Sequence, residues 1–137
     1  MTTLTWTPRA PALLLLVVHH GVVAVHGAAH LVLQISLSPF QAAYVGSVIV
    51  TLPVIAVALL FMRRVRVGGA LLFGSMIGSL AFGVASHALL GGPDNVFELS
   101  SGAWATVFQV TSILLAVTEA IAAVVAVGLV RFAAQTS

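Results

Sequence analysis

The residues of this chain that could perform chemistry are histidines and one acid, all set within long apolar stretches. They are His19, His20, His26, His30, His87 and Glu119. His26 and His30 are spaced i, i+4, so on a helix both rings can address one ion. Imidazole and carboxylate ligands suit zinc, iron(II) and copper(II). The pattern therefore predicts a transition-metal site, and its predicted ligands are His26, His30, His87 and Glu119.

A second interpretation is a membrane cytochrome, in which haem b is held by two histidines from separate helices. The pair would be His30, or His26, with His87. Gly27 and Gly83 lie close to these histidines in the sequence and could make room for the ring. Haem propionates usually pair with cations, and the half of the predicted bundle that holds these histidines lacks lysine and arginine. This lack argues against haem.

A third interpretation is a small proton- or ion-coupled transporter. His19, the three predicted histidine ligands and Glu119 would form a ladder of titratable groups across most of the bilayer, as in proton relays. Glu119 could instead be the counter-ion of a substrate. Transport would require an oligomer, because four helices are expected to enclose little more than a packed seam. The last alternative is structural, with these side chains only forming hydrogen bonds between helices.

Other chemistries are excluded by what the sequence lacks. Without cysteine there are no disulfides, thiolate metal sites or iron–sulfur clusters. No phosphate-binding glycine loop and no serine nucleophile motif is present. Five arginines are too few for a nucleic-acid surface. If the protein is an enzyme, we expect a metal-dependent oxidoreductase, in which an open metal position activates a small ligand.

The elements that must position these residues follow from composition. Of 137 residues, 61% are hydrophobic and 6% charged, against about 25% charged in soluble domains. Four stretches reach the length of about 20 residues that a membrane span needs: 11–36, 39–62, 67–90 and 103–132. Backbone groups in lipid must bond internally, so these stretches should be helices. We expect an all-α integral membrane protein, residues 1–137 forming one antiparallel up-down four-helix bundle in the lipid bilayer. A homo-oligomer or a larger membrane complex stays open.

Orientation follows from the arginines. All five lie before the first span, between the second and third, or at the end of the fourth, so the positive-inside rule puts these places in the cytoplasm. We therefore expect a plasma-membrane protein with both termini cytoplasmic. A signal peptide is the alternative for Arg9 and the apolar run after it, but that run continues past His26.

Smaller signals mark the helix ends. Ser38, Pro39 and Gln41 form a capping-box pattern that predicts the start of the second span. Pro53 predicts a kink within that span. Asp94 and Glu98 lie in the loop before the fourth span, where we expect them to be solvated; the alternative is that they guide a cation toward His87. His19 and His20 receive no firmer role than contact with the membrane interface.

Overall fold

A computed structural model describes residues 9–135, and all regular elements within this range are helical. In chain order they are α1 (Arg9–Val32), α2 (Pro39–Tyr44), the π-helical segment η1 (Val45–Thr51), α3 (Leu52–Phe61), α4 (Val65–Val84), the π-helical segment η2 (Ala85–Leu89) and α5 (Ala103–Gln135). The segments α2, η1 and α3 follow one another without a break, and so do α4 and η2.

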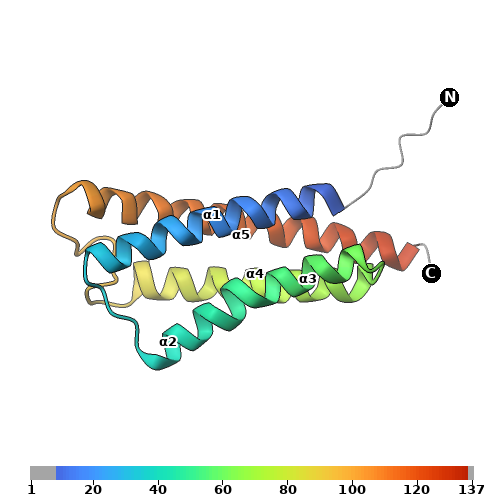
Figure 1. Ribbon diagram of the computed structural model, residues 1–137, viewed down its shortest axis with the longest axis horizontal. Coiled ribbons are helices and arrows are strands. Elements are labelled where there is room, and N and C mark those ends of the chain that lie inside the picture. Colours follow the sequence, from blue (N-terminus) through green and yellow to red (C-terminus); the bar gives the residue numbers. More distant parts are fainter. Residues whose placement is uncertain (1–8, 136–137) are drawn as a thin grey trace.

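Four continuous helices are long and apolar enough to cross a membrane: Arg9–Val32, Pro39–Phe61, Val65–Leu89 and Ala103–Gln135. They pack as an antiparallel bundle, in which α1 begins and α5 ends at the same end (Figure 1). Many large apolar side chains, such as Leu14, Leu31 and Val124, point outward and are exposed. The predicted all-α bundle is thus confirmed, and its outer surface suits contact with lipid.

The first span is shorter than predicted, because α1 ends at Val32. Gln34 has a φ of 57°, a left-handed conformation that stops the helix. The Ile35 N–H then donates to the His30 carbonyl over 2.9 Å, which closes the helix end and folds Ile35 back beside His30. Arg63, with a φ of 62°, follows the second span in the same conformation.

The predicted capping box at the start of the second span is confirmed. The Ser38 N–H donates to Gln41 Oε1 over 2.8 Å, and the Gln41 N–H donates to Ser38 Oγ over 3.3 Å. Pro39 occupies the first helical turn, where its missing N–H costs nothing. The second span therefore starts at a defined residue shortly after the first one ends.

Pro53 interrupts the regular helix of the second span. It has no N–H, so the Ile49 carbonyl four residues earlier loses its usual α-helical donor. The chain forms the π-helical segment η1 just before this point. Thr51 Oγ1 donates to the Gly46 carbonyl over 2.7 Å, and His19 Nε2 lies 3.4 Å from the Ile49 carbonyl oxygen. Side chains thus satisfy carbonyls in the stretch that precedes the proline.

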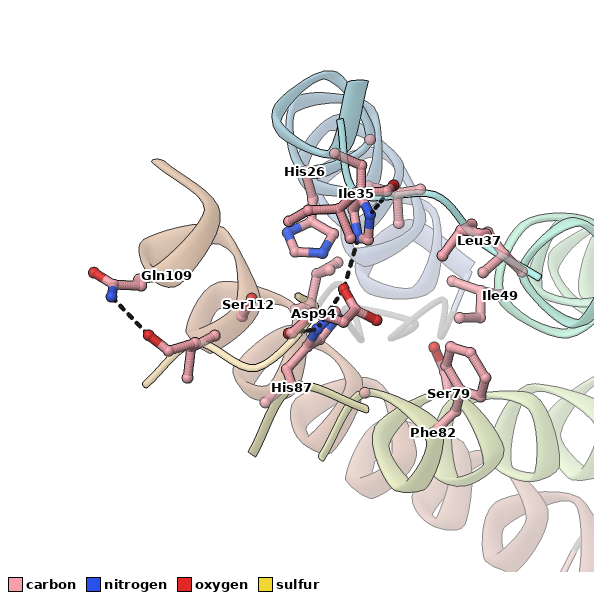
Figure 2. Close-up of a pocket in the computed structure, with 18 of the residues that line it drawn as sticks. His26, Ile35, Leu37, Ile49, Ser79, Phe82, His87, Asp94, Gln109 and Ser112 are labelled. Atoms are coloured by element: carbon pink, nitrogen blue, oxygen red, sulfur yellow. Dashed lines mark hydrogen bonds and ion pairs between the residues drawn. The ribbon is translucent and has the colours of Figure 1, made fainter. Parts of the chain in front are cut away.

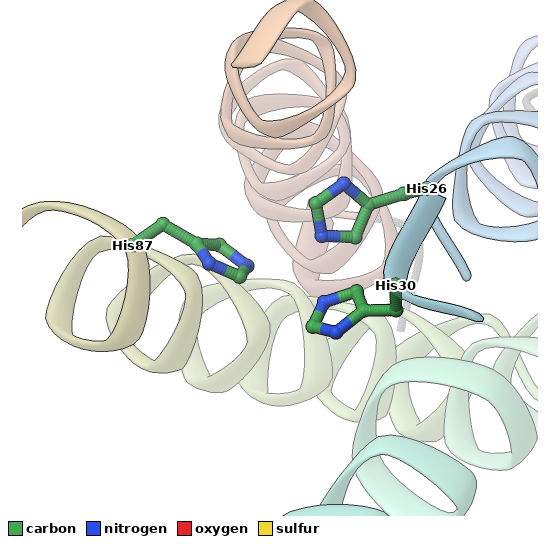
Figure 3. Close-up of side chains that lie close together, drawn as sticks. All are labelled: His26, His30 and His87. Carbon is green, nitrogen blue, oxygen red and sulfur yellow. The ribbon is translucent and has the colours of Figure 1, made fainter. Parts of the chain in front are cut away.

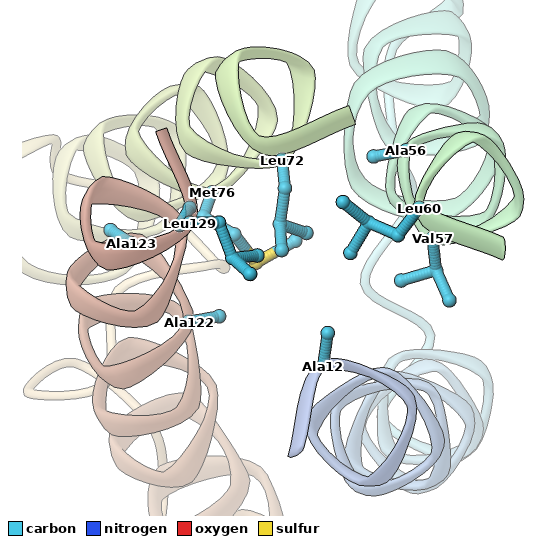
Figure 4. Close-up of a cluster of buried hydrophobic side chains, with 10 residues drawn as sticks. Ala12, Ala56, Val57, Leu60, Leu72, Met76, Ala122, Ala123 and Leu129 are labelled. Atoms are coloured by element: carbon cyan, nitrogen blue, oxygen red, sulfur yellow. The ribbon is translucent and has the colours of Figure 1, made fainter. Parts of the chain in front are cut away.

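The two ends of the bundle differ in packing. The end that carries Arg63 and Arg64 is referred to below as the arginine end, and the end with residues 90–102 as the loop end. Toward the arginine end, buried apolar side chains of all four spans form one cluster (Figure 4): Ala12, Ala56, Val57, Leu60, Leu72, Met76, Ala122, Ala123, Ala126 and Leu129. A Cβ added to Gly68 would lie 2.8 Å from the Ala56 carbonyl oxygen. The backbones of α3 and α4 therefore approach closely here.

At the loop end the second span leans away from the others. Figure 1 shows α2 diverging from the rest of the bundle, and α2 has no buried residue. A cavity of about 1230 Å³ lies at this end between the first, second, third and fourth spans. The four helices therefore leave more space at this end than the packed seam that we expected.

Candidate metal centre

Three histidines from two spans meet at the loop end. His26 and His30 lie one turn apart on α1, and His87 comes from η2. The ring centroid of His26 lies 4.9 Å from that of His30 and 4.9 Å from that of His87. The centroids of His30 and His87 are 5.9 Å apart. One nitrogen of each ring lies within 4.8 Å of the others. Figure 3 shows the three rings turned toward a common space.

Phe108 of α5 forms one wall of this cluster. Its ring centroid lies 4.5 Å from that of His26, 5.0 Å from that of His30 and 5.1 Å from that of His87. Phe108 is fully buried and packs with Ala29 and Ile35 in a small apolar cluster. The fourth span therefore fixes the histidines through an aromatic contact.

Two of the histidines have a defined protonation pattern. His30 Nδ1 donates to the Ile35 carbonyl over 3.3 Å, and His87 Nδ1 donates to the Asp94 carbonyl over 3.0 Å. A carbonyl oxygen can only accept, so in the neutral rings the proton lies on Nδ1. The lone pair of each ring is then on Nε2, the arrangement that metal-binding histidines commonly show.

His26 follows the same pattern through a different partner. Its Nδ1 lies 2.9 Å from Thr111 Oγ1. When the Thr111 hydroxyl donates to the Val107 carbonyl (2.7 Å) or to the Phe108 carbonyl (3.1 Å), its oxygen accepts from His26 Nδ1. His26 Nε2 is buried and has no hydrogen-bond partner among the described residues. Such an unpaired buried nitrogen needs an explanation, and a bound cation would provide one.

Asp94 is the carboxylate nearest to these rings. Its Oδ1 lies 3.3 Å from His87 Nδ1 and 3.5 Å from His30 Nε2, as the dashed lines in Figure 2 mark. Burial alone would raise the pKa of Asp94, but in the metal-free protein the hydrogen bond with His87 and the positive charge of the protonated His87 ring outweigh burial and lower this pKa. The expectation that Asp94 is solvated is wrong, because its side chain is only 16% exposed.

The loop before α5 folds Asp94 inward through several hydrogen bonds. Gly92 has a φ of 125°, which favours glycine, and the Asn95 amide donates to the Leu90 carbonyl over 2.8 Å. The Val96 N–H donates to the His87 carbonyl over 2.9 Å, and Gln109 Nε2 donates to the Val96 carbonyl over 2.8 Å. The loop is thereby joined to both the third and the fourth span.

Glu119 lies outside the group of three histidines. It is buried on α5, only 3% exposed, and Ser79 of α4 donates its hydroxyl to Glu119 Oε1. Glu119 and the three histidines line the same cavity. The structure therefore brings His26, His30 and His87 together, whereas Glu119 is paired with Ser79. Glu119 as a metal ligand stays a prediction.

The remaining histidines, His19 and His20, lie nearer the N-terminus of α1, about 10 Å from His26 at the usual helical rise. His20 Nδ1 lies 2.9 Å from the Leu16 carbonyl oxygen, and His20 Nε2 lies 3.1 Å from that of Val50. His19 is buried against the second span. Both rings therefore join α1 to the π-helical part of the second span, a role that the sequence analysis missed. Pro53 was the signal in the sequence, because it leaves the Ile49 carbonyl four residues earlier without its usual donor.

Comparison with known proteins gives no family: no family model matches the chain, and no match is found among curated proteins or solved structures. Function therefore has to be argued from the site itself. The described residues combine four helices of membrane-spanning length with a histidine cluster that is compatible with metal binding.

Proposed function

We propose that this membrane protein binds a transition metal ion through the Nε2 atoms of His26, His30 and His87. One observation carries the proposal: each ring has its Nδ1 beside a hydrogen-bond acceptor, while the rings face one space. This leaves three neutral nitrogen donors without a dense negative charge in the membrane. Zinc, copper(II) and iron(II) accept such ligands.

Small side-chain movements would close the site around an ion. Two nitrogens on one tetrahedral zinc lie about 3.3 Å apart, given bonds of about 2.0 Å. One ring nitrogen of each histidine lies within 4.8 Å of one from each of the other two, so bringing these nitrogens onto one ion requires each ring to move by roughly 1 Å. Asp94 Oδ1, 3.5 Å from His30 Nε2, is the nearest carboxylate for a fourth position. Water or a small molecule in the cavity is the other candidate for that position.

The crowding around the histidines favours a single ion over haem. A porphyrin is a wide disc that extends from its iron in every direction. Around the His30–His87 pair, the rings of His26 and Phe108 already lie within 5.1 Å of both ligand rings. Among the described residues, no lysine or arginine lines the cavity to meet the propionates. Haem would therefore require His26 and Phe108 to move aside, and an absorption spectrum with a Soret band would establish it.

The arginine end gives the expected orientation in the membrane. Arg9, Arg63, Arg64, Arg66 and Arg131 are all at or near this end. We propose that it faces the cytoplasm of a plasma-membrane protein, so that the metal site lies in the outer half of the bilayer. The role of the ion is then metal handling or redox chemistry with a small ligand from the cavity. An enzyme built this way would be an oxidoreductase.

Metal titration of purified protein tests the proposal. Zinc and copper(II) binding is measured by calorimetry and elemental analysis on wild type and on His26→Ala, His30→Ala and His87→Ala. We expect one ion per chain in wild type and at least a hundredfold weaker binding in each variant. His20→Ala is the matched control and should retain the ion. Equal metal content in wild type and in all three site variants would overturn the proposal, and Glu119→Gln in the same series tests the predicted fourth ligand.

A further inference from the structure

Glu119 is a buried acid that the proposed three-histidine site does not use. The only side-chain hydrogen bond assigned to it in the described structure comes from Ser79 Oγ. No arginine or lysine lies in its cavity, because all five arginines are at or near the arginine end. A carboxylate inside the membrane is costly unless a counter-charge or several hydrogen bonds stabilise it. Among the described residues, Glu119 therefore has no lysine or arginine as a counter-charge, and its basic electrostatic neighbour is the imidazole of His87.

The cavity beside Glu119 is large. At about 1230 Å³ it exceeds what an ion and a few waters need, since one water occupies about 30 Å³. Pockets for organic ligands are typically about 300–1,000 Å³. The space therefore suits an organic molecule better than water alone.

The lining of this cavity is mainly apolar and carries acids but no bases apart from the imidazoles. Its walls include Leu80, Phe82 and Ile113, while Asp94 and Glu119 are its carboxylates (Figure 2 shows Phe82, Ser79 and Asp94 around it). An anionic ligand would meet two acids without a lysine or arginine to pair with. An apolar body with a positive charge is complementary to both features.

We infer that the cavity is a binding site for a lipophilic cation, with Glu119 as its counter-ion. The charged group would sit against the Glu119 carboxylate where this residue lines the cavity, while Ser79 holds Oε1. Aromatic Phe82 would add a favourable contact with a cation.

This inference does not depend on the metal site, because Glu119 lies outside the histidine group. Two other occupants predict different behaviour. A cavity that takes neutral lipid would bind an apolar ligand regardless of its charge. If Glu119 serves only the metal, substitution of Glu119 would not change the binding of an organic cation. The test therefore compares two ligands of one shape and opposite charge.

Binding of tetraphenylphosphonium and of its near-isosteric anion tetraphenylborate is measured on purified full-length protein with a chelator present. We expect wild type to bind the cation at least tenfold more tightly than the anion. Glu119→Gln should lose at least tenfold in affinity for the cation, and Glu119→Asp should recover part of it. Glu98→Gln is the control, because Glu98 accepts a hydrogen bond only from the exposed loop backbone at Gly92 among the described contacts.

The outcomes separate binding from misfolding. Retained tetraphenylborate binding and an unchanged elution volume in Glu119→Gln would show that the variant is folded. If Glu119→Gln does not fold, the affinity of Glu119→Asp for the cation decides, because this variant keeps the charge. Equal binding of both ions by wild type, or undiminished cation binding in Glu119→Gln, would overturn the inference.

Discussion

The arginine end and the loop end of this bundle use the same four helices in opposite ways. At the arginine end, ten buried apolar residues from all four spans pack together, and Gly68 lets two backbones approach. At the loop end, α2 buries nothing, and imidazoles and carboxylates line part of a mainly apolar cavity. Lipid offers helices no hydrophobic reason to associate, so close packing must hold the bundle together. The comparison indicates that one end supplies close packing, whereas the other holds the cavity and the histidine cluster.

At the loop end, local hydrogen bonds act together with the small apolar cluster of Ala29, Ile35 and Phe108. Ser38 and Gln41 fix the start of the second span, and Gln109 anchors the loop through the Val96 carbonyl. His26 and His87 are held by Thr111 and by the Asp94 backbone. Side chains for binding can then surround a cavity without collapse of the helices onto one another.

The largest expected effect on stability is at the arginine end. Leu129 is fully buried, so Leu129→Ala should lower the free energy of unfolding by about 2 kcal/mol, near the low end for a buried leucine because lipid also solvates leucine. Leu114→Ala on the same helix, 44% exposed, should cost less than about 0.5 kcal/mol. Unfolding in mixed detergent micelles measures both. Equal losses would contradict the division of roles.

The second-largest expected effect on stability concerns the close approach of the α3 and α4 backbones. Gly68→Ala should destabilise the protein by roughly 1–2 kcal/mol, because the new Cβ would lie 2.8 Å from the Ala56 carbonyl oxygen. Gly21→Ala on α1 is the matched control, since its Cβ would meet nothing within 4 Å. Thermal unfolding in detergent compares them. A Gly68→Ala protein as stable as wild type would mean that the two backbones are not in contact.

A substitution at the loop end should separate binding from stability. Thr111→Val removes the acceptor for His26 Nδ1 and should weaken zinc affinity about tenfold, with little change in unfolding. Thr118→Val on the same helix is the control, because its hydroxyl donates only to the Leu115 carbonyl among the described contacts. Calorimetric zinc titration measures the difference. Equal affinities in the two variants would show that Thr111 does not orient His26.

The smallest expected effect is a pH dependence at Asp94 in the metal-free protein. The pKa of Asp94 in the folded protein is lower than its ordinary value. The stabilisation that ionised Asp94 contributes is therefore present above about pH 4 and is lost as the pH falls below about 4. Wild type and Asp94→Asn should therefore differ by less than about 1 kcal/mol at pH 6, and this difference should become smaller at pH 3. Unfolding at both pH values measures this. A difference that grows toward pH 3 would contradict the lowered pKa.

The sequence predicted the fold better than the site. Hydropathy and length located the four spans, because a bilayer demands long apolar helices. The end of α1 was misplaced, since the left-handed conformation of Gln34 leaves no mark in the hydropathy. The divergence of α2 and the presence of the cavity also depend on how the helices pack.

Spacing and chemistry predicted the three histidines of the candidate site. Two share a helix face at i, i+4, and the bundle topology brings His87 to the same end. Asp94 was interpreted as a solvated loop acid because its burial depends on hydrogen bonds made by Asn95 and the loop backbone. The Ser79–Glu119 pair could not be predicted, because the rotation of α4 against α5 is set by three-dimensional packing.

X-ray absorption at the metal edge of zinc- or copper-loaded protein tests the central claim most directly. We expect one ion per chain with three imidazole nitrogens at about 2.0 Å, a shell that loses one nitrogen in His87→Ala and is unchanged in His20→Ala. An ion bound through oxygen atoms alone, or the same spectrum in wild type and His87→Ala, would contradict it.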